Sequence, residues 1–124
     1  VYEVQGLPVT PYMVPQDCGM HMQTKWLEIV RKTSLDNTDR GGRSSRLKIT
    51  AEEGKDFAFS CLPYTAQELE NAMHYEELPP ARRTVVSILG AVRGVGGINS
   101  WGADVEDIYH ISGEQDISYG FWIE

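Results

Sequence analysis

Acidic side chains that lie close together in the sequence are the first candidates for catalysis. They occur as the groups Glu52 with Glu53, Glu76 with Glu77, and Asp104 with Glu106 and Asp107. A glycosidase needs two carboxylates that face each other across a cleft, whereas neighbours such as Glu52 and Glu53 in a turn point apart. No serine or cysteine has a base at a recognisable spacing that would activate it as a nucleophile. The sequence therefore predicts no catalytic residue in this chain.

Histidines and cysteines are too scattered to predict a metal site. His21, His74 and His110 share no ligand spacing, and neither Cys18 nor Cys61 belongs to a CxxC motif. We expect His74 to be half-buried at a helix end and His21 to face solvent or lie at a rim. A disulfide between the two cysteines stays open, but two free thiols in a reducing compartment are favoured. No metal ion is expected from this chain alone.

The segment GVGGINSWGADV, residues 94–105, places Trp101 in a loop of glycine and small polar residues. A dinucleotide-binding fingerprint would need a third glycine where Asn99 stands, and a helix after it, so that interpretation is rejected. An aromatic ring on such a loop is typical of a stacking platform for sugar rings or of an anchor at an interface. The alternative is that Trp101 folds back as a plug in its own core, and the residues alone leave both open.

Length and composition limit the classes of function. With 124 residues, 41% of them hydrophobic, the chain suits one small domain over residues 1–124. A net charge of −7 argues against nucleic acid as a partner, because nucleic-acid binding needs a basic surface. No stretch reaches the roughly 18 apolar residues of a membrane span, and the first residues show no signal peptide. We therefore expect neither nucleic acid nor a membrane as a partner.

Alternation of apolar and polar residues predicts strands. These are expected over 21–32, 46–51, 55–62, 83–92, 105–111 and 115–124. In the third of them, Phe57, Phe59 and Cys61 share one face. Residues 1–19, rich in proline, and the polar segment 33–45 are expected to be irregular or loops.

One helix is expected after Thr65, which forms a capping box with Glu68. Leu69 and Met73, four residues apart, lie on one face of it, and the prolines at 79–80 stop it. Short strands with turns between them and a single helix indicate an all-β fold, an antiparallel β-sandwich with one short helix.

Three stretches in order resemble the C-terminal region of the large bacterial β-galactosidases of glycoside hydrolase family 2. TPYMVPQDCG (10–19) resembles their TPY-x-x-P-x-E/D-x-G segment. FAFSCLPYTAQELENAMHYEELP (57–79) resembles F-x-F-x-x-x-x-Y-[ST]-x-x-x-L-x-x-x-x-H-x-x-x-L. GVGGINSWGADV (94–105) resembles G-[IV]-G-G-x-[DN]-S-W-x-x-x-V. The resemblance extends from about residue 7 to the end of the chain.

The resemblance implies a fold and a site. The chain would be the C-terminal part of a sandwich domain similar to the galactose mutarotase fold. The family's tryptophan of the SW motif matches Trp101 and would bind substrate by stacking on the aglycone sugar, with Asn99 and Ser100 shaping the loop. The segment departs from the family in lacking the first half of the sandwich and in having Cys18 where a polar residue is common.

The resemblance also implies partners. The nucleophile, the acid/base glutamate, Mg²⁺ and Na⁺ would lie in a separate TIM-barrel domain, so this segment would hold no cofactor and be inactive when isolated. Its partners would be that domain, a galactoside bound by the full enzyme, and further copies in a homo-oligomer. A cytoplasmic location is expected, with the periplasm left open because a signal would lie upstream.

Two other functions remain open from the sequence. The first is a free-standing carbohydrate-binding or mutarotase-like module, which would need a histidine and a glutamate converging on a sugar pocket. The second is a subunit-assembly module, which would fit the missing half of the sandwich and its exposed sheet edges.

Overall fold

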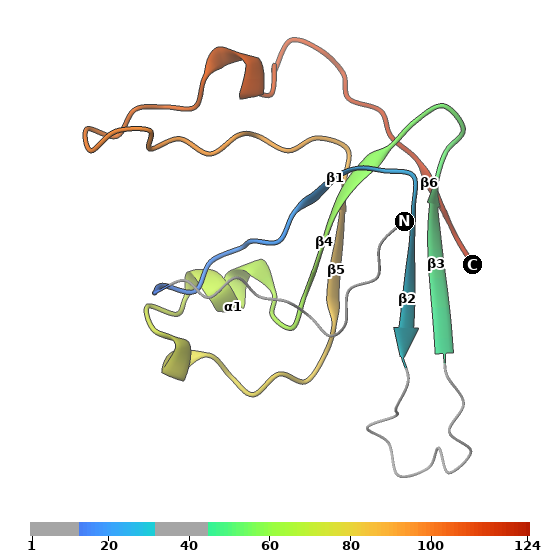
Figure 1. The fold of residues 1–124 in the computed structure, drawn as a ribbon, viewed down its shortest axis with the longest axis horizontal. Helices are drawn as coiled ribbons and strands as arrows, with labels where there is room; N and C mark the ends of the chain where they lie inside the picture. The colour runs from blue at the N-terminus through green and yellow to red at the C-terminus, as the bar shows by residue number, and fades with distance from the viewer. Residues whose placement is uncertain (1–12, 32–44) are drawn as a thin grey trace. The chain divides into compact units, whose positions relative to one another are not determined.

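The computed structural model describes residues 13–31 and 45–124. These residues form two three-stranded antiparallel sheets and one short helix, α1, together with two short 3-10 helices, η1 and η2 (Figure 1). The expected all-β class with a single short helix is thus confirmed. The chain divides into two compact units, residues up to 22 with 58–89, and residues 23–57 with 90–124. One domain over residues 1–124 stays a prediction, and the loop expected at 33–45 lies outside the described residues apart from Ser45.

The first sheet has the order β1-β4-β5, formed by His21–Thr24, Phe57–Leu62 and Val85–Leu89. β4 and β5 run antiparallel, with Ser60 opposite Ser87. Ala58, Ser60 and Leu62 are all at most 5% exposed, so the even-numbered face of β4 is the buried one. Phe57, Phe59 and Cys61 alternate with these residues along β4, as the sequence predicts, but only Phe57 of the three is buried, and the other two are half-buried.

The helix α1 spans Ala66–Glu70 and begins with the expected capping box. The Oγ1 atom of Thr65 accepts the Glu68 N–H at 3.2 Å, and the Glu68 carboxylate accepts the Thr65 N–H at 2.8 Å. Leu69 is buried at 2% exposure, whereas Met73 is 70% exposed and lies beyond the last helical residue, Glu70, so the helix is shorter than expected. The physical reason is that the N–H of Met73 bonds to the Glu77 carboxylate at 2.8 Å instead of continuing the helical ladder.

The second sheet has the order β2-β3-β6, formed by Trp26–Arg31, Ser45–Ala51 and Phe121–Ile123. Thr50 lies opposite Trp26 on one side and Trp122 on the other. On the opposite face of β3, Ile49 is only 3% exposed.

The expected single strand over 21–32 is wrong. Residue 25 separates β1 from β2, which belong to different sheets. Just before the break, Gln23 adopts a left-handed backbone conformation with φ of 53°. A left-handed residue departs from the extended conformation that one continuous strand over 21–32 would require.

The expected strands after residue 83 are too long. The strand within 83–92 spans only Val85–Leu89, and the strand within 115–124 spans only Phe121–Ile123. Residues 105–111 form no strand; they contain η2, Asp107–Tyr109. The N–H groups of Tyr109 and His110 bond back to carbonyls three residues earlier, at 2.9 and 3.1 Å, so they are not available to a neighbouring strand. Among residues 13–31 and 45–124, no helix has the length and apolar character that crossing a membrane requires.

Candidate functional site

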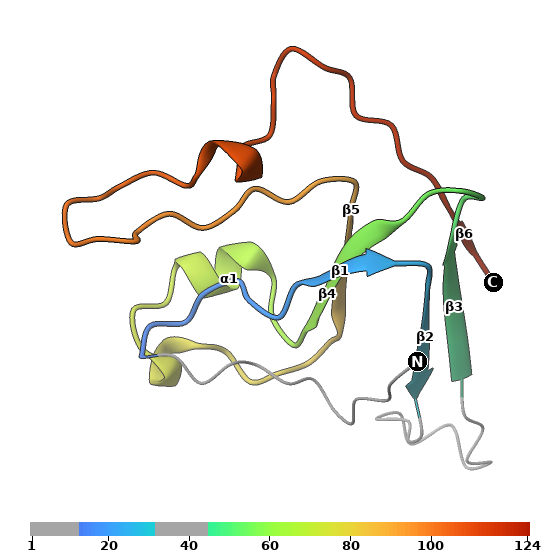
Figure 2. The same cartoon turned by 45° about the horizontal axis from the view of Figure 1, so that its top comes forward.

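The glycine-rich segment 94–105 forms a long loop, the orange part of the ribbon in Figures 1 and 2. Its outgoing limb leads from β5 to the turn that carries Trp101, and its returning limb leads from that turn toward η2. The two limbs run side by side. The outgoing limb is tied to η2 by the bond from the Gly94 N–H to the Tyr109 carbonyl, 2.9 Å. Nearer the tip, the Gly97 N–H donates to the Ala103 carbonyl at 2.8 Å. Trp101 lies in the turn between the limbs and is 88% exposed. It is therefore no plug in the core of the described residues.

Glycine is required in this loop for two different reasons. Gly97 and Gly102 have φ of 86° and 72°, the left-handed region in which a side chain is strained. Gly94 and Gly96 instead allow the limbs to approach. A Cβ atom on Gly96 would lie 2.8 Å from the Ala103 carbonyl oxygen, and one on Gly94 would lie 2.4 Å from a methyl group of the opposite limb.

Asn99 organises the turn that carries the tryptophan. Its Oδ1 atom accepts the N–H of Trp101 at 2.9 Å and the N–H of Ala103 at 3.3 Å. Such a side-chain bond stabilises a turn in the place of a backbone bond. Ser100 is exposed and directly precedes Trp101. The three sequence-predicted site residues thus lie together at the loop tip, while their contact with a substrate stays a prediction.

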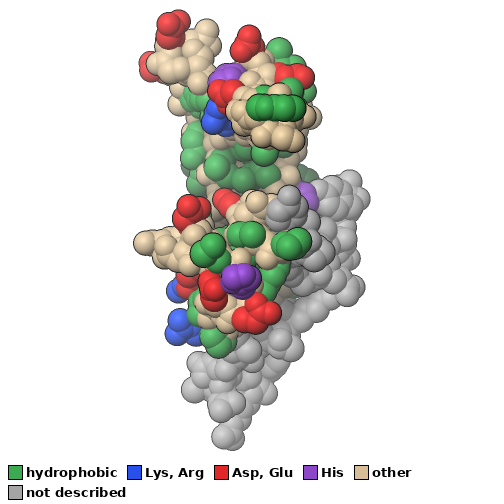
Figure 3. Space-filling model, turned by 90° about the vertical axis from the view of Figure 1, so that its left-hand side faces the viewer, with side chains coloured by type: hydrophobic (Ala, Val, Ile, Leu, Met, Phe, Trp, Pro, Cys, Tyr) green, Lys and Arg blue, Asp and Glu red, His purple; other side chains and the backbone are tan. Residues whose placement is uncertain are grey.

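The loop tip is apolar as well as exposed. Val95 and Ile98 are 91% and 73% exposed and accompany Trp101. Figure 3 shows hydrophobic side chains exposed at several places on one face of the molecule, among acidic, basic and other side chains. Three large apolar side chains are thus exposed within seven residues of one loop.

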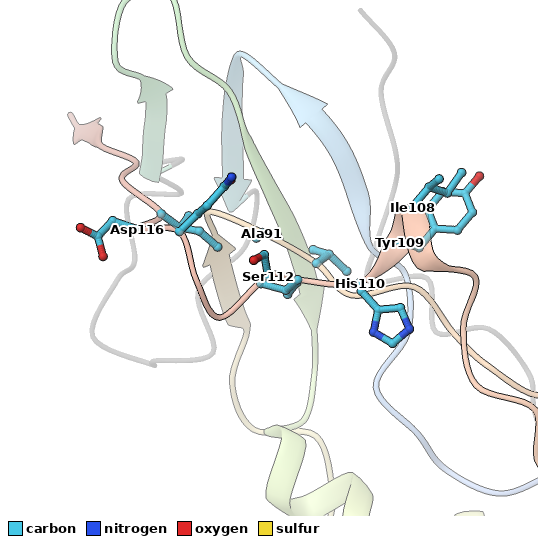
Figure 4. A pocket seen from close by; sticks show the side chains of 10 residues that line it. Ala91, Ile108, Tyr109, His110, Ser112 and Asp116 are labelled. Atoms are coloured by element: carbon cyan, nitrogen blue, oxygen red, sulfur yellow. The ribbon is translucent and has the colours of Figure 1, made fainter.

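Near the loop, the chain forms an open hollow of about 340 Å³ (Figure 4). Ala91, Val92 and the segments 108–112 and 115–117 line it. In Figure 4 the imidazole of His110 and the carboxylate of Asp116 point away from the hydroxyl of Ser112. Nucleophilic catalysis needs these groups in hydrogen-bond contact, so this arrangement provides no such set.

The acidic side chains that the sequence brings together are engaged separately. Glu52 pairs with Lys55 at 2.8 Å, and Glu77 with His74 at 2.9 Å. His74 is not half-buried as expected, because its side chain is 69% exposed. Within the described ranges, no three potential ligands lie close enough to hold a metal ion.

Arg93, Asp104 and His110 form a cluster at the base of the loop that the sequence reasoning missed. The sequence groups Asp104 with the neighbouring acidic residues and predicts no contact between it and Arg93. The side chain of Arg93 bonds to that of Asp104, from one limb to the other. The signal in the sequence is a basic residue directly before the glycine-rich segment, Arg93, and an acidic residue near its end, Asp104.

Comparison with known proteins gives two consistent results. The model of a protein family described as "Beta galactosidase small chain" matches residues 2–123. The "Beta-galactosidase small subunit" of Latilactobacillus sakei is 58% identical over 122 residues, which are 98% of this chain and 38% of that protein. No solved structure matches the chain.

Two further relatives are longer. "Beta-galactosidase BgaC" of Bifidobacterium adolescentis is 39% identical over 113 residues, 91% of this chain and 10% of that protein. A "Beta-galactosidase" of Streptococcus thermophilus is 35% identical over 114 residues, 92% of this chain and 10% of that protein. The chain thus spans a minor part of each of these three relatives.

Proposed function

Because this chain belongs to the β-galactosidase small chain family, we propose that it is a non-catalytic part of a β-galactosidase. In the assembled enzyme it provides scaffold and, through Trp101, one aromatic wall of the active-site mouth. The carboxylates that cleave the galactoside, and the Mg²⁺ and Na⁺ ions, belong to a TIM-barrel domain on the catalytic partner. The observation that carries this proposal is the 88% exposure of Trp101 on a turn held by Asn99.

The chemistry of the proposed role is stacking. A galactoside presents a patch of C–H groups on one side of each sugar ring, and an exposed indole can cover that patch. Asn99 and the hydrogen bond between Gly97 and Ala103 hold the turn, so less conformational freedom is lost when the sugar binds. A retaining enzyme first forms a covalent galactosyl intermediate and then hydrolyses it, and the aglycone leaves in the first step. A contact with the aglycone therefore affects binding of lactose more than the chemistry at the galactosyl carbon.

We also propose that the chain assembles with a catalytic partner and that the substrate of the complete enzyme is a galactoside. The names of the relatives, one of them a "Beta-galactosidase small subunit", support this part of the proposal. The two free thiols of Cys18 and Cys61 are compatible with a reducing compartment such as the cytoplasm.

Kinetics of the complete enzyme test the proposed role of Trp101. Stacking on a ring is worth about 1–3 kcal/mol by alanine substitution in base recognition, so we expect Trp101→Ala to raise KM for lactose about tenfold. Trp101→Phe should raise it less. Formation of the galactosyl-enzyme from a nitrophenyl galactoside should be largely kept. Trp122→Ala is the matched control, because Trp122 is also exposed, at 66%, but lies on β6.

Two results would contradict the proposal. The first is unchanged lactose kinetics in Trp101→Ala with a lowered melting temperature, which would assign the ring a packing role. The second is turnover of nitrophenyl galactoside by the purified isolated chain, since the segment is proposed to lack catalytic carboxylates. Galactoside binding by the isolated chain without turnover would instead favour a free-standing sugar-binding module.

A further inference from the structure

The two limbs of the glycine loop are joined at their base by charged side chains. Arg93 stands directly before the first glycine of the outgoing limb, and Asp104 lies on the returning limb. The guanidinium of Arg93 donates to Oδ1 of Asp104. The same carboxylate oxygen accepts the N–H of Val105 at 2.8 Å. The carboxylate is thereby fixed to its own limb while it binds the other one.

His110 adds a third connection. Its Nε2 atom lies 3.0 Å from the Val105 carbonyl oxygen and 3.7 Å from Oδ2 of Asp104. A carbonyl oxygen only accepts, so Nε2 carries the proton and donates it. The segment that follows η2 is thus bound to the returning limb, next to the pair of Arg93 and Asp104.

The electrostatics agree with this geometry. The pKa of Asp104 is lowered, first by the hydrogen bond from the Val105 N–H and then by the positive charges of Arg93 and His110. The carboxylate is therefore ionised at neutral pH and available to both partners. The side chains of Arg93 and Asp104 are 53% and 64% exposed, and exposed pairs of this kind add little to folding stability.

We call the cluster of Arg93, Asp104 and His110 the clamp. A loop rich in glycine presents an aromatic ring at a fixed place only if its base is held in this way. Glycine has the largest backbone freedom of all residues, and ordering it on binding would reduce affinity. The bonds at the tip hold only the turn itself. At the base, the limbs are joined to each other and to the segment around η2 by the contacts of Arg93, Asp104 and His110 and by the bond from the Gly94 N–H to the Tyr109 carbonyl.

We propose that Arg93, Asp104 and His110 are positioning residues that hold the glycine loop so that Trp101 meets the leaving sugar in the assembled enzyme. The proposal rests on the proposed function of Trp101. The three side chains do not contact the substrate and take no part in bond breaking.

A double-mutant cycle in the complete enzyme tests the clamp. Arg93→Ala should raise KM for lactose about threefold and leave formation of the galactosyl-enzyme from nitrophenyl galactoside intact. In the Trp101→Ala background the same change should add nothing, because no ring remains to be presented. Arg93→Lys keeps the charge and should restore part of the affinity.

The matched control is Arg83→Ala. Arg83 is similarly exposed, at 50%, and pairs with Glu68 in the other compact unit. We expect it to leave KM for lactose unchanged.

The outcomes separate this proposal from the one it rests on. If Trp101→Ala raises KM but Arg93→Ala does not, or if Arg93→Ala raises KM equally in both backgrounds, the clamp is overturned and the role of Trp101 stands. If Trp101→Ala itself leaves KM unchanged, the proposed function fails and the clamp fails with it.

Discussion

Replacing Gly96 by alanine should push the two limbs of the glycine loop apart. A Cβ atom at this position would lie 2.8 Å from the Ala103 carbonyl oxygen and 3.3 Å from two backbone atoms of residues 104 and 105. All three are backbone atoms, so no side-chain rotation relieves the contact. The same Ala103 oxygen accepts the Gly97 N–H at 2.8 Å, so a shift that makes room for the methyl group also weakens this bond.

The expected loss of loop stability in Gly96→Ala follows from the steric contact and the weakened hydrogen bond. Overpacking by a methyl group typically costs about 1–3 kcal/mol, and one hydrogen bond contributes about 1 kcal/mol. Because the loop is exposed and gives way more easily than a core, we expect a value near the lower end, about 1–2 kcal/mol of loop stability. In the complete enzyme the displaced Trp101 should also raise KM for lactose.

Gly113→Ala is the control for this prediction. A Cβ atom there would meet nothing within 4 Å, and Gly113 has no left-handed φ. It therefore reproduces the loss of backbone freedom in the unfolded chain without the clash. Hydrogen exchange should show reduced protection of the Gly97 amide in Gly96→Ala and not in Gly113→Ala. Equal protection in both variants would refute the close approach of the limbs.

Two further predictions concern the other compact unit. Thr65→Ala should lower the free energy of unfolding by about 1 kcal/mol because the amide of Glu68 loses its cap, whereas Thr65→Ser should retain most of it; equal urea midpoints for the two variants would contradict this. The pKa of His74 is raised by its hydrogen bond to Glu77 and then by the charge of that carboxylate. Its stabilising contribution is therefore present below the ordinary histidine pKa and is lost as pH rises through the raised value. An NMR titration should show a smaller pKa shift in Glu77→Gln, where only the charge of Glu76 still raises the pKa.

The features that the sequence predicts well are local ones. The capping box of Thr65 and Glu68 depends on residues three apart, and it forms as expected. The glycine segment 94–105 is a loop for the same kind of reason, since Gly97 and Gly102 occupy left-handed turns that few other residues adopt.

The features that the sequence predicts poorly depend on which of several possible acceptors each backbone N–H group bonds to. Residues 105–111 alternate like a strand, yet the N–H groups of Tyr109 and His110 bond to carbonyls three residues earlier, and the Tyr109 carbonyl accepts the Gly94 N–H of the glycine loop. The helix expected to reach Met73 ends early because Glu77 takes the Met73 amide. In both cases a competing acceptor, which alternation does not reveal, determines the local structure.

The sequence by itself determined the fold class, the helix start, the family and the exceptional place of Trp101 among glycines. Periodicity, caps and turn residues act over a few positions, and motif order is a property of the chain alone. Only the tertiary structure decided which face of β4 is buried, where β1 ends and β2 begins, and that Arg93, Asp104 and His110 meet at the base of the loop. The first two depend on which segments pair and pack in each sheet. The third depends on the approach of the two limbs, which brings Arg93 to Asp104 although they are 11 residues apart.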